Sequence, residues 1–129
     1  MNKLYFTFLF LCLAFTSNAQ QYPSIQSLKT DFNKVQDYIQ ADIKFISSSI
    51  EDPLNDEQIK TLETVFYNKY KHIAGSENLN NYEPVTISVS ERILGVLGSK
   101  NYDKLAEKEN AILILSGKIY LNESALSSN

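Results

Sequence analysis

The stretch LNDEQIKTLETVFYNKYKHIAG, residues 54–75, predicts the most sharply delimited helix of the chain. Asn55 and Gln58 have the spacing of a capping box, in which each side chain accepts a hydrogen bond from the other's backbone N–H. Leu54 precedes the cap and can pack on Ile59 as a hydrophobic staple. We expect Gly75 to close the helix in a left-handed conformation. The buried stripe follows helical spacing: Ile59, Leu62, Phe66, Tyr70 and Ile73.

Residues 24–50 have the same helical spacing over a greater length. Ser24 is a suitable N-cap, and Pro53 ends the run. The pattern predicts one long amphipathic helix that packs against antiparallel neighbours. Its apolar residues are separated by steps of three or four: Ile25, Leu28, Phe32, Val35, Ile39, Ile43, Ile46 and Ile50.

The second half of the chain predicts two further helices after a polar loop at residues 76–84. We expect one helix to begin at Ser88, with Glu91 completing a capping box, and to end at Gly98. A fourth segment spans about residues 99–108. Residues 110–121, NAILILSGKIYL, fit a buried helix or a hairpin of two strands (111–115 and 118–121) that residues 85–89 could join. A helix is favoured because no other part of the chain alternates like a strand.

The fold class that follows is all-α. We expect a small antiparallel helical bundle, or a helical hairpin cradle, of about four helices. The alternative is an α+β fold with a short C-terminal hairpin.

The first residues have the form of a signal peptide. Lys3 supplies a positive start, and the apolar run at residues 4–15 is shorter than the ~20 residues that span a bilayer. Ser17 and Ala19 are small residues that suit cleavage after Ala19. We therefore expect a periplasmic or secreted protein without stable membrane insertion once the signal is removed. The expected organisation is a signal peptide at 1–19, a single helical domain at 20–122 and a flexible tail at 123–129.

Signal removal also removes the only cysteine, Cys12, and with it any disulfide, thiolate nucleophile or cysteine metal ligand. Without Lys3 the chain has 11 basic and 15 acidic side chains, a formal charge near −4, and its one arginine is Arg92. Nucleic-acid binding depends on clustered Lys and Arg. We therefore expect no nucleic-acid partner.

A looser copy of the helix start at residues 54–62, LNDEQIKTL, lies at residues 97–105, LGSKNYDKL, 43 positions later. The pair resembles the twin Leu-Thr-x-x-Gln motifs of the Spy/CpxP family of small helical periplasmic proteins. Leu54 and Gln58 match the ends of the motif and Asn55 replaces its Thr, whereas the second copy has Gly98 and Asn101 for Thr and Gln. The alternative is helix-capping chemistry that two unrelated helix starts share.

The resemblance implies an exported all-helical protein, often dimeric, that forms a curved cradle. It also implies ATP-independent binding of unfolded envelope proteins, or damping of an envelope-stress sensor. The family's cradle is rich in basic side chains, whereas this chain is acidic. That departure puts binding of clients by charge in doubt.

The residues predict no catalytic, cofactor or metal site. Asp52, Asp56 and Glu57 cluster, but acidic residues are favoured at a helix start. Lys69, Lys71 and His72 lie toward the negative end of the same helix, and His72 has no second ligand at metal-binding spacing. The candidate partner-binding residues are Tyr67, Tyr70 and Tyr102, and the helix-start residues are Leu54, Asn55, Gln58, Ser88 and Glu91.

These observations predict a non-enzymatic exported protein that binds other envelope proteins or itself, chaperone-like or related to envelope stress. One alternative is a small hydrolase that acts on envelope polymers through paired carboxylates. Another is a structural subunit of an envelope complex.

Overall fold

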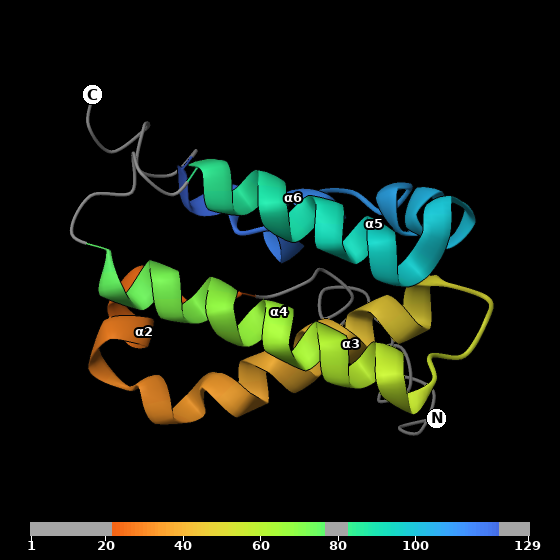
Figure 1. Cartoon of the computed structure of the whole chain (residues 1–129). Coiled ribbons are helices and arrows are strands. Elements are labelled where there is room, and N and C mark those ends of the chain that lie inside the picture. The colour runs from red at the N-terminus through yellow and green to blue at the C-terminus, as the bar shows by residue number, and fades with distance from the viewer. Residues whose placement is uncertain (1–21, 77–82, 122–129) are drawn as a thin grey trace, which may run out of the picture.

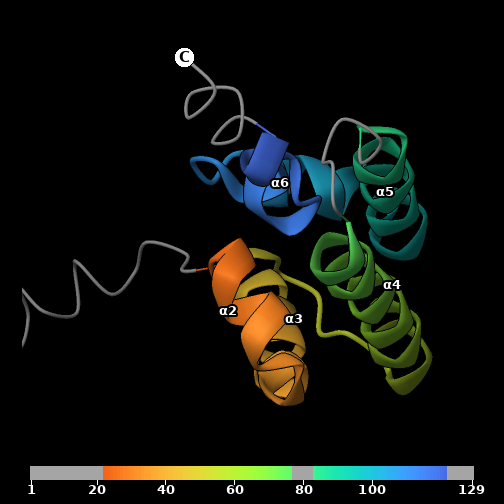
Figure 2. The ribbon, with the colours of Figure 1, turned by 90° about the vertical axis from the view of Figure 1, so that its left-hand side faces the viewer.

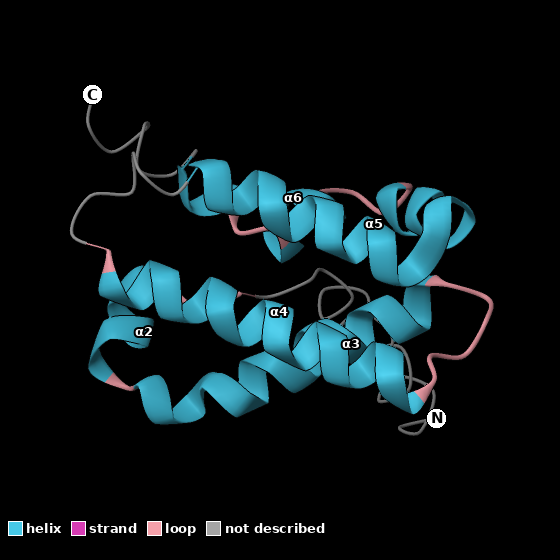
Figure 3. Cartoon of the chain, in the orientation of Figure 1, coloured by secondary structure: helices cyan, strands magenta, loops and turns pink. Residues whose placement is uncertain are grey.

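A computed structural model describes residues 22–76 and 83–121, and every regular element in these ranges is a helix (Figures 1 and 3). The predicted all-α fold is confirmed. The predicted signal peptide and tail lie outside the described residues. The elements are α2 (Ile25–Thr30), the 3-10 turn η1 (Phe32–Lys34), α3 (Val35–Ser49), α4 (Asp56–Gly75), α5 (Glu83–Ala106) and α6 (Ala111–Leu115).

The successive helices α3, α4 and α5 run antiparallel to one another (Figure 1). After α5, the chain turns back and forms α6 beside this helix (Figure 1). The end-on view shows α2 and α3, α4, α5 and α6 arranged around a common centre (Figure 2). Helix α4 contacts α2, α3 and α5, so it is the central element of the bundle.

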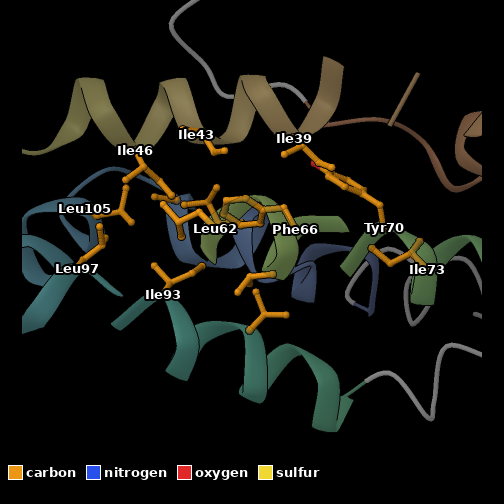
Figure 4. Close-up of a cluster of buried hydrophobic side chains, with 14 of the residues drawn as sticks. Ile39, Ile43, Ile46, Leu62, Phe66, Tyr70, Ile73, Ile93, Leu97 and Leu105 are labelled. Carbon is orange, nitrogen blue, oxygen red and sulfur yellow. The ribbon is translucent and has the colours of Figure 1, made fainter. Parts of the chain in front are cut away.

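Most residues of the apolar stripes predicted in 24–50 and 54–75 lie in the core, where they face side chains of α5 (Figure 4). Ile25 and Phe32 are the exceptions in the first stripe, since both are only partly buried. Each fully buried aliphatic side chain contributes roughly 1.5–3 kcal/mol. Helix α4 buries four of its five predicted stripe residues, whereas Ile59 is only partly buried. The labelled core residues are Ile39, Ile43, Ile46, Leu62, Phe66, Tyr70, Ile73, Ile93, Leu97 and Leu105.

The prediction of one continuous helix over residues 24–50 is wrong, because the chain leaves the helical conformation at Asp31 (φ −144°, ψ 68°). Thr and Asp have low helix propensity, since their side chains compete for backbone groups. Here the Thr30 hydroxyl donates to the Gln26 carbonyl at 2.8 Å. The break lets α2 pack against α4 with Leu28 fully buried. Apolar spacing continues across it and so does not reveal it.

The predicted helix start at Ser88 and Glu91 is also wrong. Helix α5 begins at Glu83, so both residues are exposed positions inside it, and residues 85–89 are helical rather than a strand. Pro84 explains the earlier start. Its fixed φ suits the first turn of a helix, where a missing N–H leaves no intrahelical hydrogen bond unmade.

Two of the predicted helix boundaries lie at glycines, and only Gly98 has a left-handed backbone. Gly98 has φ 79° and ψ 161°, so the predicted end of a helical run there is confirmed, and residues 99–106 form the next helical segment. Gly75 does not have the predicted left-handed conformation, because α4 ends instead through extended Ser76. The C-terminal strand hairpin does not form, since residues 111–115 are α6 and residues 118–121 are helical.

The two similar stretches, residues 54–62 and 97–105, lie at the same end of the bundle (Figure 1). Asn55 and Gln58 form the predicted capping box, with reciprocal hydrogen bonds of 2.8 and 2.9 Å. The Gln58 side-chain amide also donates to the Val96 carbonyl at 2.9 Å. Lys104 lies 3.1 Å from the Glu51 carboxylate. These contacts join the start of α4 and the α3–α4 connection to the Gly98 bend.

Candidate functional site

Helix α5 exposes two large apolar side chains. Ile87 is 56% exposed and Leu94 is 40% exposed. They are seven residues apart, which places them on one face of the helix two turns from each other. Helix α6 packs on α5, yet both side chains remain exposed.

A groove of about 410 Å³ runs beside Ile87, between α5 and the segment that contains α6. Its apolar lining comes from Ile87, Ile112 and Leu113, and the last two are partly buried. We call Ile87, Leu94, Ile112 and Leu113 the apolar face of α5. The polar lining residues are Thr86, Ser90, Glu91, Ser116 and Lys118.

The three predicted partner-binding tyrosines lie in different environments. Tyr67 is 38% exposed and meets Phe32 edge-on, with ring centroids 6.0 Å apart. Tyr70 is buried, which agrees with its place in the core stripe and removes it from the surface candidates. Tyr102 is half-buried against the core. Only Tyr67 therefore has the exposure that contact with a partner requires.

A buried polar cluster joins α3 to α4 and was not predicted. The Lys69 ammonium lies 2.8 Å from Oδ2 of Asp42, and the Tyr70 hydroxyl donates to the same oxygen at 2.5 Å. Lys69 is 1% exposed and Asp42 is 2% exposed. Lys69 Nζ also lies 4.1 Å from the Tyr70 ring centroid and 4.7 Å from that of Phe66.

The charges of this cluster compensate each other. Burial lowers the pKa of Lys69, and the neighbouring Asp42 carboxylate opposes that shift. Because the two groups are directed at each other and shielded from solvent, we interpret the pair as a contact that fixes how α3 sits on α4. The position of Lys69 toward the negative end of the helix did not reveal that its side chain is buried.

One sequence signal could have found this pair. Asp42 lies three residues after Ile39 and four before Ile46, so it occupies the apolar stripe of α3. Lys69 stands at the same intervals between Phe66 and Ile73 on α4. Charged residues at stripe positions of two adjacent helices indicate a buried pair when their signs are opposite.

The carboxylates and the histidine lie at the surface. Asp56 and Glu57 are exposed in the first turn of α4, and His72 is exposed in its last turn. Within residues 22–76 and 83–121, no group of three or more His, Cys, Asp or Glu side chains is placed to hold a metal ion. In the same ranges no helix has both the length and the apolar character to cross a bilayer.

No protein-family model matches this sequence, and no curated protein or solved structure is significantly similar to it.

Proposed function

We propose that this protein is an exported, non-enzymatic binding protein that holds another protein on the apolar face of α5. What supports the proposal is the exposure of Ile87 and Leu94 on one helix face beside a groove with apolar lining. Single exposed apolar side chains are common and need no explanation. Here two lie on one face, and Ile87 adjoins the partly buried Ile112 and Leu113 in the groove, so a partner can cover these apolar side chains together.

The size of this surface favours weak and reversible binding. Covering the exposed parts of Ile87 and Leu94 contributes on the order of 1–2 kcal/mol each. Such a contact suits transient holding of apolar segments in unfolded proteins, with release that needs no ATP. The resemblance of residues 54–62 and 97–105 to the Spy/CpxP motifs leads to the same proposal, a chaperone-like protein of the envelope.

The test mixes purified residues 20–129 with several aggregating client proteins at equimolar amounts and follows light scattering. We expect the chain to suppress scattering, and the double variant Ile87→Ser/Leu94→Ser to lose at least half of that suppression. Lys44→Ser is the control, because Lys44 is exposed on α3, away from the apolar face of α5, and we expect this variant to keep the suppression. Circular dichroism checks that all three proteins are equally helical.

Two results would contradict the proposal. One is unchanged scattering with every client. The other is a double variant as active as the unaltered chain, which would show that the apolar face of α5 does not hold the partner.

A further inference from the structure

A second surface lies on the opposite flank of α5, where this helix packs on α4. Two adjoining hollows of about 530 and 400 Å³ lie between these helices and share Val65 and Arg92. We call them together the α4–α5 groove. Its other lining residues are Lys60, Thr61, Thr64, Gly95 and Val96 in the first hollow, and Asn68, Lys69, His72, Pro84, Val85, Ser88 and Val89 in the second.

The α4–α5 groove is basic although the protein is acidic. It contains Lys60, Arg92 and His72, and no described Asp or Glu lines it. The acidic residues Asp56, Glu57 and Glu63 of α4 and Glu91 of α5 are not among its lining residues. Over the whole chain, by contrast, 15 Asp and Glu residues outnumber 12 Lys and Arg residues and one His. The groove therefore favours a negatively charged occupant.

Arg92 stands where the two hollows join, and its guanidinium is available to a ligand. The side chain is exposed, and within the described part of the chain it makes no ion pair or hydrogen bond. Lys69 differs, because its charge is already compensated by Asp42. A guanidinium can bind a carboxylate through two parallel hydrogen bonds, which gives orientation as well as attraction.

The length of the groove indicates an extended occupant. Lys60 and His72 are twelve residues apart on α4, or about 18 Å along the helix axis at ~1.5 Å per residue. One small anion cannot contact both ends. An extended peptide spans ~3.3 Å per residue, so about six residues match this length.

The remaining lining suits a peptide better than a bare polyanion. Val65 and Val89 are 2% and 5% exposed and form an apolar floor for aliphatic side chains. Thr61 and Thr64 donate their hydroxyl protons to helix carbonyls, which leaves their oxygens able to accept from peptide N–H groups. Asn68 and Ser88 add further polar groups along the same line.

We propose that the α4–α5 groove binds an extended acidic peptide segment of about six residues, with Arg92 holding a carboxylate at its centre and Lys60 and His72 contacting the ends. This site is separate from the apolar face of α5. Either proposal can fail alone, because the aggregation test above does not alter the groove.

The experiment measures fluorescence anisotropy of a labelled, end-blocked hexapeptide of alternating Glu and Val, titrated with residues 20–129. The reference peptide carries Gln in place of Glu. We expect the Gln peptide to bind at least tenfold more weakly, and Arg92→Gln to weaken binding of the Glu peptide about tenfold. Lys44→Gln is the matched control, since Lys44 is exposed on α3 and outside the groove, and we expect a change below twofold.

Amide chemical shifts of the unaltered protein give an independent readout, with perturbations expected at Thr61, Ser88 and Gly95. If Arg92→Gln disturbs folding, Lys60→Gln replaces it. Equal affinity for the two peptides, no measurable binding, or unchanged binding by a folded groove variant would overturn the proposal. A sulfated polysaccharide that binds more tightly than the Glu peptide would also overturn it, because the occupant would then be a glycan.

Discussion

At the residue scale, the Asp42–Lys69 pair is the least expected feature of the core. A buried ion pair adds little net stability compared with apolar residues, but removing one partner leaves an uncompensated charge. The sequence predicted the residues around the pair correctly, because Ile39, Phe66 and Ile73 follow apolar spacing. Spacing places each charged side chain in the apolar stripe of its own helix, but it does not by itself show that the two meet, since that depends on which helices become neighbours.

Replacing Lys69 by Met is expected to destabilise the protein by about 3 kcal/mol, because Asp42 would be left charged in the core. The double variant Asp42→Asn/Lys69→Met is expected to recover part of that loss, since Asn is neutral and can still accept from the Tyr70 hydroxyl. Urea unfolding monitored by circular dichroism measures both. A Lys69→Met protein within 1 kcal/mol of the original would speak against this account of the pair.

At the element scale, local chemistry predicted some helix boundaries and missed others. The capping box of Asn55 and Gln58 and the interruption at Gly98 were predicted, because both depend on residues close in sequence. The break at Asp31 and the start of α5 were not. The apolar spacing continues through Asp31, and Ser88 and Glu91 have capping spacing although they lie inside a helix.

Two glycines of α5 are expected to respond to alanine with opposite signs. Gly98→Ala is expected to destabilise the protein by about 1–3 kcal/mol, because φ 79° with ψ 161° is a conformation that only glycine adopts readily. Gly95→Ala is expected to stabilise it by about 0.5–1 kcal/mol through the higher helix propensity of alanine. Neither added methyl group meets a neighbouring atom within 4 Å, so a difference in stability between the two variants reflects backbone conformation rather than steric clashes. Thermal unfolding of both variants provides the measurement, and the same sign for both would contradict this explanation.

The Gln58 side chain makes two hydrogen bonds, one within the capping box and one to α5, and we expect both to stabilise the protein. Gln58→Glu keeps an oxygen that can accept from the Asn55 N–H but loses the donor to the Val96 carbonyl. We expect a loss of about 1 kcal/mol. Asn55→Ser is the control, because serine is an equally good cap and the change should be close to neutral. Chemical denaturation compares the two, and a Gln58→Glu protein of unchanged stability would show that the bridge to Val96 adds nothing.

At the scale of the whole molecule, the amphipathic stripes were sufficient to predict an all-α bundle. They could not predict which parts of α5 are covered, because that depends on how the chain returns after Gly98 and on where α6 packs against α5. The two surfaces proposed for binding both flank α5. The sequence alone therefore could not predict these two surfaces.

The two ends of the described chain are joined by Tyr120. Its hydroxyl donates to the Pro23 carbonyl at 2.6 Å, and its ring meets that of Tyr22 edge-on. Tyr120→Phe keeps the ring and removes this hydrogen bond, so we expect a loss of about 1 kcal/mol. That corresponds to a fall in Tm of about 4–8 °C for a domain of this size. Differential scanning calorimetry tests this prediction, and an unchanged Tm would mean that the hydrogen bond to the Pro23 carbonyl does not stabilise the protein.

The central claim is that apolar stripes on α3, α4 and α5 hold the bundle together. They thereby fix the position of α5, which carries the apolar face of α5 and one wall of the α4–α5 groove. Amide hydrogen exchange of residues 20–129, followed by NMR, tests this most directly. We predict that the slowest amides belong to all three helices, around Ile39, Phe66 and Ile93, and open with one common free energy equal to that of global unfolding. Strong protection confined to α4, with α5 exchanging freely, would contradict the account.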